Sequence, residues 1–158
     1  SNPAHPGEQL DWRELQLAAR SLGVTLQYLV VRTASDFDGA FGAITKERAE
    51  ALVPIPDAVS LVNRKLIAEF ALKNGLPTVA AWSEFAESGC LLSYGPNLRD
   101  GYKRLATYVD RILKGTKAGD LPVERPSRFE LVINLKTAKA LGVTIPRSLL
   151  LRADRVIE

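Results

Sequence analysis

Residues 24–56 read VTLQYLVVRTASDFDGAFGAITKERAEALVPIP, and this stretch decides the predicted fold. Its first nine residues are rich in β-branched side chains, which is typical of a buried strand. Ser35 or Asp36 can cap a helix that continues to about Ala49. The apolar run ALVPIP (51–56) then predicts a second strand. A strand, a helix and a strand in succession indicate a βαβ unit, and hence a parallel sheet covered by helices.

The alternation of helices and strands continues on both sides of this stretch. Upstream, residues 8–22 carry apolar side chains at helical spacing, and Gly23 follows where a helix ends. Downstream, the pattern predicts helices over 59–74, 97–114 and 135–142, strands over 76–82, 90–95 and 129–135, a short turn over 83–89 and a last helical turn over 148–158. We therefore predict an α/β fold with a parallel sheet flanked by helices, in which ligands bind beyond the carboxyl ends of the strands.

The composition is that of a globular protein. The 158 residues are 46% hydrophobic and 25% charged, which suits one domain with a buried core. A single cysteine and a single histidine rule out a disulfide framework and argue against a Cys/His zinc site. The net charge of +3 is spread over mixed acidic and basic residues, which disfavours nucleic acid as a partner. No apolar run is long enough to span a membrane.

Sequence motifs for catalysis or cofactor binding do not occur in the chain. There is no Walker A sequence, no G-x-G-x-x-G after a strand and no G-x-S-x-G. A Cys90–His5 nucleophile pair is formally available, but Cys90 opens an apolar strand and fits a small core residue better. We expect no catalytic residue, no metal ligand and no cofactor.

Polar and aromatic residues follow the predicted strands at the edge of the sheet where ligands bind. Asp57 comes after ALVPIP and before a helix, so it is a helix N-cap, a ligand contact or both. Trp82 and Tyr94 end two strands, where an aromatic ring either stacks on a ligand or packs at the rim of the core. Ser60 and Ser93 offer hydroxyl groups nearby. We predict ligand-binding roles for these five residues.

The helix predicted over residues 97–114 has the clearest amphipathic pattern in the chain, with Gly115 at its end. Its apolar face consists of Leu98, Tyr102, Leu105, Val109 and Ile112. A stripe of this size is normally covered. An isolated chain is therefore predicted to pair or swap this helix with a second copy as a homodimer, or to hold it against its own body.

The C-terminal part of the chain, DLPVERPSRFELVINLKTAKALGVTIPRSLLLRADRVIE (120–158), resembles the end of ABC-transporter substrate-binding proteins of the tryptophan/tyrosine type. The stretches SYGPNLRDGYKRLATYVDRILKGTKAGDLPVE (93–124) and LPTVAAWSEFAESGCLL (76–92), together with the opening SNPAHPG (1–7), extend the resemblance over almost the whole chain. This resemblance implies a type I periplasmic-binding-protein fold, in which two α/β lobes hold a solute in the cleft between them.

The resemblance also divides the chain into three parts and makes it the C-terminal half of a longer protein. Residues 1–92 would form the α/β core of the second lobe. Residues 93–115 would form a crossing strand and a helix that docks on the absent first lobe, and residues 116–158 a connector and the return to the second lobe. The sequence has no methionine, so we expect that a leader was removed or that the chain is a fragment.

The function implied by the resemblance is that of the solute-binding component of an ABC importer. It would bind a small organic solute, for example an amino acid, without chemistry, in the periplasm, and deliver it to a permease of the inner membrane. Amino-acid-binding members often have Thr-Asp-Asn where this chain has Pro56-Asp57-Ala58, which makes Asp57 the first candidate to hold a cationic group. A ligand-sensing or scaffold domain of the same fold is the alternative. A small α/β enzyme is disfavoured, because no histidine follows a strand.

Overall fold

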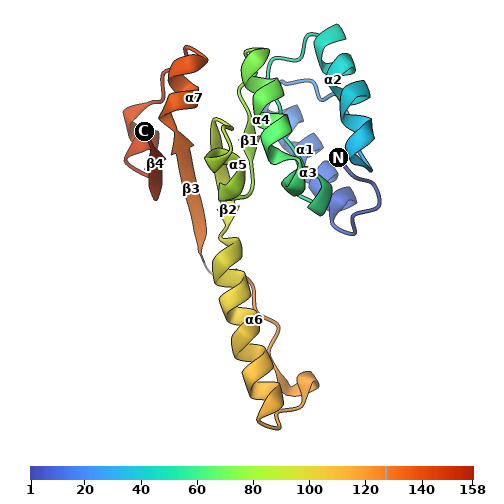
Figure 1. Cartoon of the computed structure of the whole chain (residues 1–158), viewed down its shortest axis with the longest axis vertical. Helices are drawn as coiled ribbons and strands as arrows, with labels where there is room; N and C mark the ends of the chain where they lie inside the picture. The colour runs from blue at the N-terminus through green and yellow to red at the C-terminus, as the bar shows by residue number, and fades with distance from the viewer. Residues whose placement is uncertain (127) are drawn as a thin grey trace.

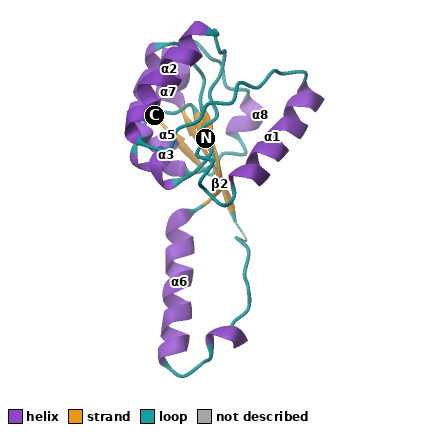
Figure 2. Ribbon diagram, turned by 90° about the vertical axis from the view of Figure 1, so that its right-hand side faces the viewer, coloured by secondary structure: helices purple, strands orange, loops and turns teal. Residues whose placement is uncertain are grey.

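The structure, a computed structural model, describes residues 1–126 and 128–158. Its body is a small sheet with helices around it, and one helix projects from the body as an arm (Figures 1 and 2). The helices are α1 (Glu8–Leu22), α2 (Phe37–Lys46), α3 (Ala58–Val62), α4 (Arg64–Lys73), α5 (Ser83–Glu87), α6 (Leu98–Leu113), α7 (Leu135–Ala140) and α8 (Arg147–Leu150), with 3₁₀ turns at Ala34–Asp36 and Ala118–Asp120. The strands are β1 (Val79–Ala80), β2 (Leu92–Pro96), β3 (Phe129–Asn134) and β4 (Arg155–Ile157).

The four strands lie in the order β1-β2-β3-β4. β1 pairs with β2 in parallel, and β3 with β4, whereas β2 and β3 are antiparallel with Pro96 opposite Phe129. The predicted α/β fold, a mostly parallel sheet flanked by helices, is confirmed. The antiparallel pair of β2 and β3 is the one exception among these strands to the predicted parallel arrangement. The reason is that the chain leaves the body after β2, builds the arm and re-enters through β3 from the outer end (Figure 2).

Two predicted strands, residues 24–32 and 51–56, do not form strands in the structure. One isolated parallel bridge joins Leu52 to Thr78, and single backbone hydrogen bonds join Val31 and Leu29 to Ser1. β-branched residues favour a pleated, half-buried surface, but a strand also needs a neighbour paired over several residues. The two predictions are wrong because local composition does not show whether that neighbour is in register.

The other differences lie at element boundaries. The helix predicted over residues 59–74 is divided into α3 and α4 at Asn63, whose side-chain amide donates to the Val59 carbonyl at 2.9 Å. The helical turn predicted over residues 148–158 ends early, because α8 stops at Leu150 and β4 follows. β4 pairs with the end of β3, a partner too distant in the sequence for local periodicity to reveal.

The centre of the core lies between α4, α5 and the sheet. Phe85, Val132 and Ile133 have no exposed surface, and Cys90 lies in the same cluster as Phe85 and Ile67. Cys90 is 1% exposed, so it is a small core residue, as the sequence predicts. Burial raises the pKa of its thiol to about 12.

We expect the Cys90 thiol to be unreactive in the folded chain. Thiolate is the reacting form, and a buried thiol with a high pKa supplies almost none of it at pH 8. An aromatic disulfide reagent that releases a coloured thiolate should label Cys90 only after urea is added. Rapid labelling at pH 8 without urea would contradict the buried position.

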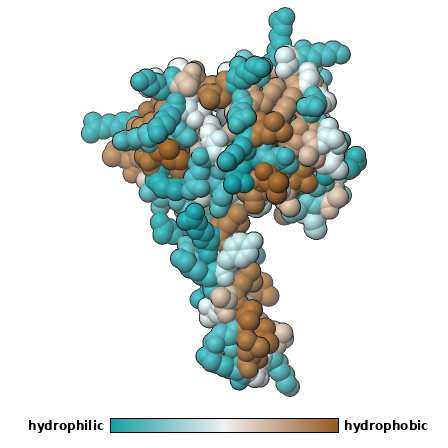
Figure 3. Space-filling view, in the orientation of Figure 1, coloured by the Kyte–Doolittle hydropathy of each residue, from teal (hydrophilic) through white to brown (hydrophobic). Residues whose placement is uncertain are grey.

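The arm, α6, is bounded by an N-cap and buries none of its residues. Tyr102, Leu105 and Val109 are all more than half exposed, and an apolar strip runs along the arm in Figure 3. The returning connector lies beside the helix, because Tyr108 donates its hydroxyl to the Pro122 carbonyl and Arg104 pairs with Glu124. The apolar stripe of α6 is therefore not held against the body, which removes one of the two predicted alternatives.

Candidate functional site

Asp57 is the N-cap of α3 and is only 5% exposed. Its carboxylate accepts the Ser60 amide at 2.7 Å, and the Ser60 hydroxyl accepts the Asp57 amide at 3.0 Å. The Asn2 side chain donates to the other carboxylate oxygen at 2.8 Å. This arrangement is a capping box, to which a contact from the start of the chain is added. Asp57 and Ser60, predicted separately as site residues, thus form one unit.

The electrostatics keep Asp57 ionised. Burial on its own raises the pKa of a carboxyl group, but the hydrogen bonds donated by Ser60, Asn2 and the Val59 amide outweigh this effect. The pKa of Asp57 therefore lies below its ordinary value. A buried, ionised carboxylate at this edge of the lobe favours a positively charged partner.

Asp57 gives the stability of the chain a pH dependence. Because its folded pKa is lower than its unfolded pKa, its contribution is complete above the unfolded value of about 4 and is lost as the pH falls below it. We expect the free energy of unfolding in urea to fall between pH 5 and pH 2. Asp57→Asn keeps an N-cap side chain but removes the charge, and should flatten this fall. Equal pH slopes for both chains would contradict the assigned shift.

A second buried carboxylate, Glu8, was not predicted from the sequence. It is 4% exposed and accepts the Ser1 hydroxyl at 2.6 Å and the Tyr28 hydroxyl at 2.5 Å. These hydrogen bonds, that from Ser1 first, lower its pKa. The Tyr28 ring in turn lies against Trp12, with ring centroids 4.6 Å apart. In the sequence, Glu8 stands at the start of a predicted surface helix, where a glutamate is normally exposed. Its burial depends on Tyr28, 20 residues later, and the local pattern does not reveal this contact.

The remaining predicted residues are placed apart from Asp57. Trp82 is half-buried at the N-terminus of α5, with its ring centroid 6.5 Å from that of Phe85. Tyr94 is 58% exposed at the base of the arm, and its ring lies 5.7 Å from Phe129. Ser93 is fully buried, and its hydroxyl has no hydrogen-bond partner among the described residues. Adjacent residues of a strand point to opposite faces, so Ser93 and Tyr94 cannot line the same surface of β2.

Two further kinds of feature, a metal-ion cluster and a membrane-spanning helix, are absent from residues 1–126 and 128–158. Within these ranges no group of three or more histidine, cysteine, aspartate or glutamate side chains could hold a metal ion. Over the same ranges, no helix combines the length and the apolar character needed to cross a membrane.

The fold defines a lobe of the kind found in substrate-binding proteins of transporters. A conserved domain protein of Vibrio cholerae O1 biovar El Tor has a TM-score of 0.89 and 27% identity, over 98% of this chain and 52% of that one. An ABC domain of Streptococcus pneumoniae in complex with L-Trp has a TM-score of 0.89 and 24% identity, over 99% and 54%. A ligand-free, open substrate binding protein of Clostridium difficile, CD0873, has a TM-score of 0.70 and 20% identity, over 99% and 52%.

A family model described as ABC transporter substrate binding protein matches residues 2–157. The chain belongs to this family, which confirms the resemblance seen in the sequence. The chain spans about half the length of each of the three structures to which it is similar. A search among curated proteins found no match.

Proposed function

We propose that the chain is one lobe of the solute-binding component of an ABC importer. In this role the protein performs no reaction, because it binds a small organic solute in a cleft between two lobes and passes it to a permease. The observation that carries the proposal is the family match over residues 2–157. From this family role we also propose that the protein acts outside the cytoplasm, at the membrane that holds the permease, and that nucleic acid is not a partner.

The proposed domain organisation follows from the half-length of the chain and the exposed arm. Residues 1–92 form the core of this lobe, and residues 93–115 carry the crossing strand and the helix that docks on the other lobe. Residues 116–158 return the chain to this lobe. In the chain alone, the same helix would pair with a second copy. The antiparallel pairing of β2 with β3 supports this division, because it is the point where the chain leaves the body and re-enters it.

The proposed site uses Asp57 as its charged member. Its buried, ionised carboxylate would pair with an ammonium group of the solute, and the Asn2 and Ser60 contacts would hold it in place. Trp82 and the exposed Tyr94 would supply stacking area at the cleft. Ser60 completes the proposed set, whereas Ser93, which is buried on the face of β2 opposite Tyr94, is not kept in it. We propose an amino acid as the solute class, which fits a carboxylate facing a cationic group.

The test is a titration of the chain, joined to the sequence that precedes it in its gene, with L-tryptophan and with indole-3-propionate, which lacks the amino group. If Asp57 pairs with the ammonium group, Asp57→Ala should weaken L-tryptophan binding by about 2–5 kcal/mol. Indole-3-propionate should bind the native and Asp57→Ala proteins alike. Asp38→Ala, which removes an exposed aspartate from α2, is the matched control. Unchanged L-tryptophan affinity in Asp57→Ala would remove Asp57 from the site.

A further inference from the structure

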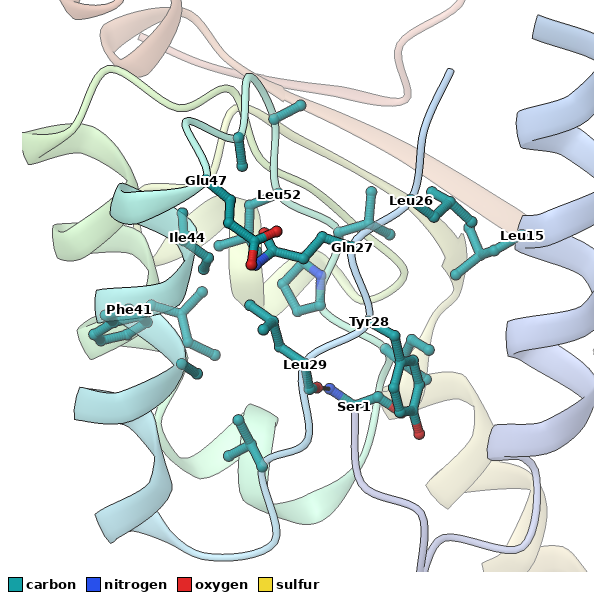
Figure 4. A pocket seen from close by; sticks show the side chains of 18 of the residues that line it. Ser1, Leu15, Leu26, Gln27, Tyr28, Leu29, Phe41, Ile44, Glu47 and Leu52 are labelled. Atoms are coloured by element: carbon teal, nitrogen blue, oxygen red, sulfur yellow. Dashed lines mark hydrogen bonds between the residues drawn. The ribbon is translucent and has the colours of Figure 1, made fainter. Parts of the chain in front are cut away.

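A partly open gap of about 690 Å³ separates residues 23–31 from residues 47–55 (Figure 4). The two stretches contain the predicted strands that do not form in the structure. The lining of the gap also includes Asp57, so the gap is continuous with the proposed solute site. Protein interiors are packed as densely as organic crystals, so an open gap between two strand-like segments indicates that an element between them is absent.

The first two residues of the chain lie between the ends of these two stretches. The Ser1 amino group donates to the Leu29 carbonyl at 2.9 Å, and this bond is drawn in Figure 4. The Ser1 carbonyl accepts the Val31 amide at 2.7 Å. On the other side, the Asn2 side chain donates to Asp57, which directly follows the second predicted strand. Residues that precede Ser1 therefore reach the gap from the end that both stretches share.

The two hydrogen bonds of Ser1 have the pattern of a parallel β-ladder. In such a ladder a residue donates to the residue before its partner and accepts from the residue after its partner. Ser1 stands in this relation to Val30, because its bonds go to residues 29 and 31. In a longer chain the Ser1 nitrogen is a peptide N–H, which donates in the same way. Residues that precede Ser1 and continue the ladder would lie beside residues 25–29.

Backbone amides on both sides of the gap are free to pair with such a strand. Alternate amides of an extended segment point to the same side, so those of Gln27 and Leu29 share the side that bonds to Ser1. Across the gap, Leu52 directs its backbone bonds toward the start of β1, so Val53 and Ile55 direct theirs toward the gap. None of these four amides has a hydrogen-bond partner among the described residues. Backbone N–H groups inside proteins are almost always paired.

We propose that the residues directly preceding Ser1 in the longer protein fill the gap as a strand, parallel to residues 24–32 and 51–56. The inference rests on the proposal that the chain is one lobe of a longer protein, and it spans about half of each similar structure. The added strand would join both stretches to the four-stranded sheet through the bridge between Leu52 and Thr78. It explains why these stretches have the composition of strands without forming them.

The proposed strand also has an expected length and composition. About five residues are needed to run beside residues 25–29 at the rise of a strand. Figure 4 shows α1 and α2 on opposite sides of the gap, so both faces of the strand would be covered. Parallel strands buried on both faces are continuous apolar runs rich in β-branched residues. We therefore expect the residues before Ser1 to be apolar and uncharged.

The test compares the 158-residue chain with the same chain extended by the roughly ten residues that precede Ser1 in its gene. We expect hydrogen exchange at the amides of Gln27, Leu29 and Val53 to slow by about 100-fold in the extended chain, because these amides become ladder donors. The amides of Tyr28 and Val30 face the other way and should slow far less. The control is an extension of the same length made of glycine and serine, which should leave exchange unchanged.

A second pair of variants tests the strand itself. Proline in place of the second residue before Ser1 removes the donor opposite the Gln27 carbonyl and should abolish the slowing, because a central strand does not accept proline. Alanine at the same position should preserve most of it.

Three results would overturn the proposal. One is equal exchange in the extended and unextended chains. Another is slowing at Tyr28 and Val30 instead of Gln27 and Leu29, which would place the segment on the outer edge. The third is strong protection of Leu29 and Val53 in the unextended chain, because the two stretches would then pair directly. Solute is not needed for this test, so a protected gap in a protein that does not bind L-tryptophan would refute only the proposed solute.

Discussion

Gly95→Ala should cost the chain about 3 kcal/mol or more of its free energy of unfolding. A Cβ atom built at Gly95 would lie 2.2 Å from the Ala81 carbonyl oxygen and 2.9 Å from its carbonyl carbon. Both are backbone atoms at the end of β1, so they can move only if β1 and β2 separate. Overpacking of a core typically costs about 1–3 kcal/mol when side chains can adjust, and here they cannot. Urea unfolding followed by tryptophan fluorescence would measure the loss.

The control for this prediction is Gly101→Ala. Gly101 lies within α6, and nothing is within 4 Å of a Cβ built there. Alanine is a better helix former than glycine, so this change should stabilise α6 by up to about 1 kcal/mol. A Gly95→Ala chain as stable as the native one would show that β1 and β2 do not approach as closely as described.

Helices with strong local signals could be predicted from the sequence. α1 ends at Leu22 before Gly23, which adopts a left-handed conformation, as the pattern of apolar residues and the glycine predict. α6 begins after Asn97, whose side chain accepts the Asp100 amide at 3.2 Å. These features depend on residues within one or two turns of each other, and the chain supplies them without reference to the rest of the fold.

The strands could not be predicted as well, because their partners lie far away in the sequence. Residues 24–32 have the composition of a strand but no paired neighbour, whereas Arg155–Ile157, a run of only three residues at the end of the chain, pair with β3. The direction of β3 depends on the arm that precedes it. Pairing partners and their register are long-range properties that no local pattern determines.

The candidate site also combines a local feature, which the sequence predicts, with long-range contacts, which it does not. Asp57 and Ser60 are three residues apart, and this spacing alone permits the capping box that the structure contains. The contact between Asn2 and Asp57 joins residues 55 positions apart, and that between Glu8 and Tyr28 joins residues 20 apart. Neither has a sequence signal. The buried carboxylate Glu8 was therefore missed, although it lies near the start of a helix that was predicted correctly.

The net charge of α6 and of the connector that follows it indicates what kind of surface covers the apolar stripe of α6. Residues 97–128 contain eight basic and four acidic residues, so this segment carries +4 in a chain whose net charge is +3. Two basic arms repel each other when they pair, whereas an acidic rim around an apolar groove would attract one. We therefore expect the other lobe to be the preferred partner of α6, and a second copy to pair with it only when that lobe is absent.

Leu105→Lys combined with Val109→Lys should block both pairings of α6, with the other lobe and with a second copy, and leave the fold of this chain intact. Both side chains are more than half exposed, so the free energy of unfolding of this chain should change by no more than about 0.5 kcal/mol. Light scattering should show that any dimer of the chain becomes a monomer. In the proposed two-lobe protein, the same pair of changes would bury two unpaired charges and should prevent the lobes from assembling. The control is Thr107→Lys with Asp100→Asn, which adds the same charge to the opposite face of α6. It should neither dissociate a dimer nor prevent the lobes from assembling. A large loss of stability in this chain alone would mean that the stripe packs on its own body.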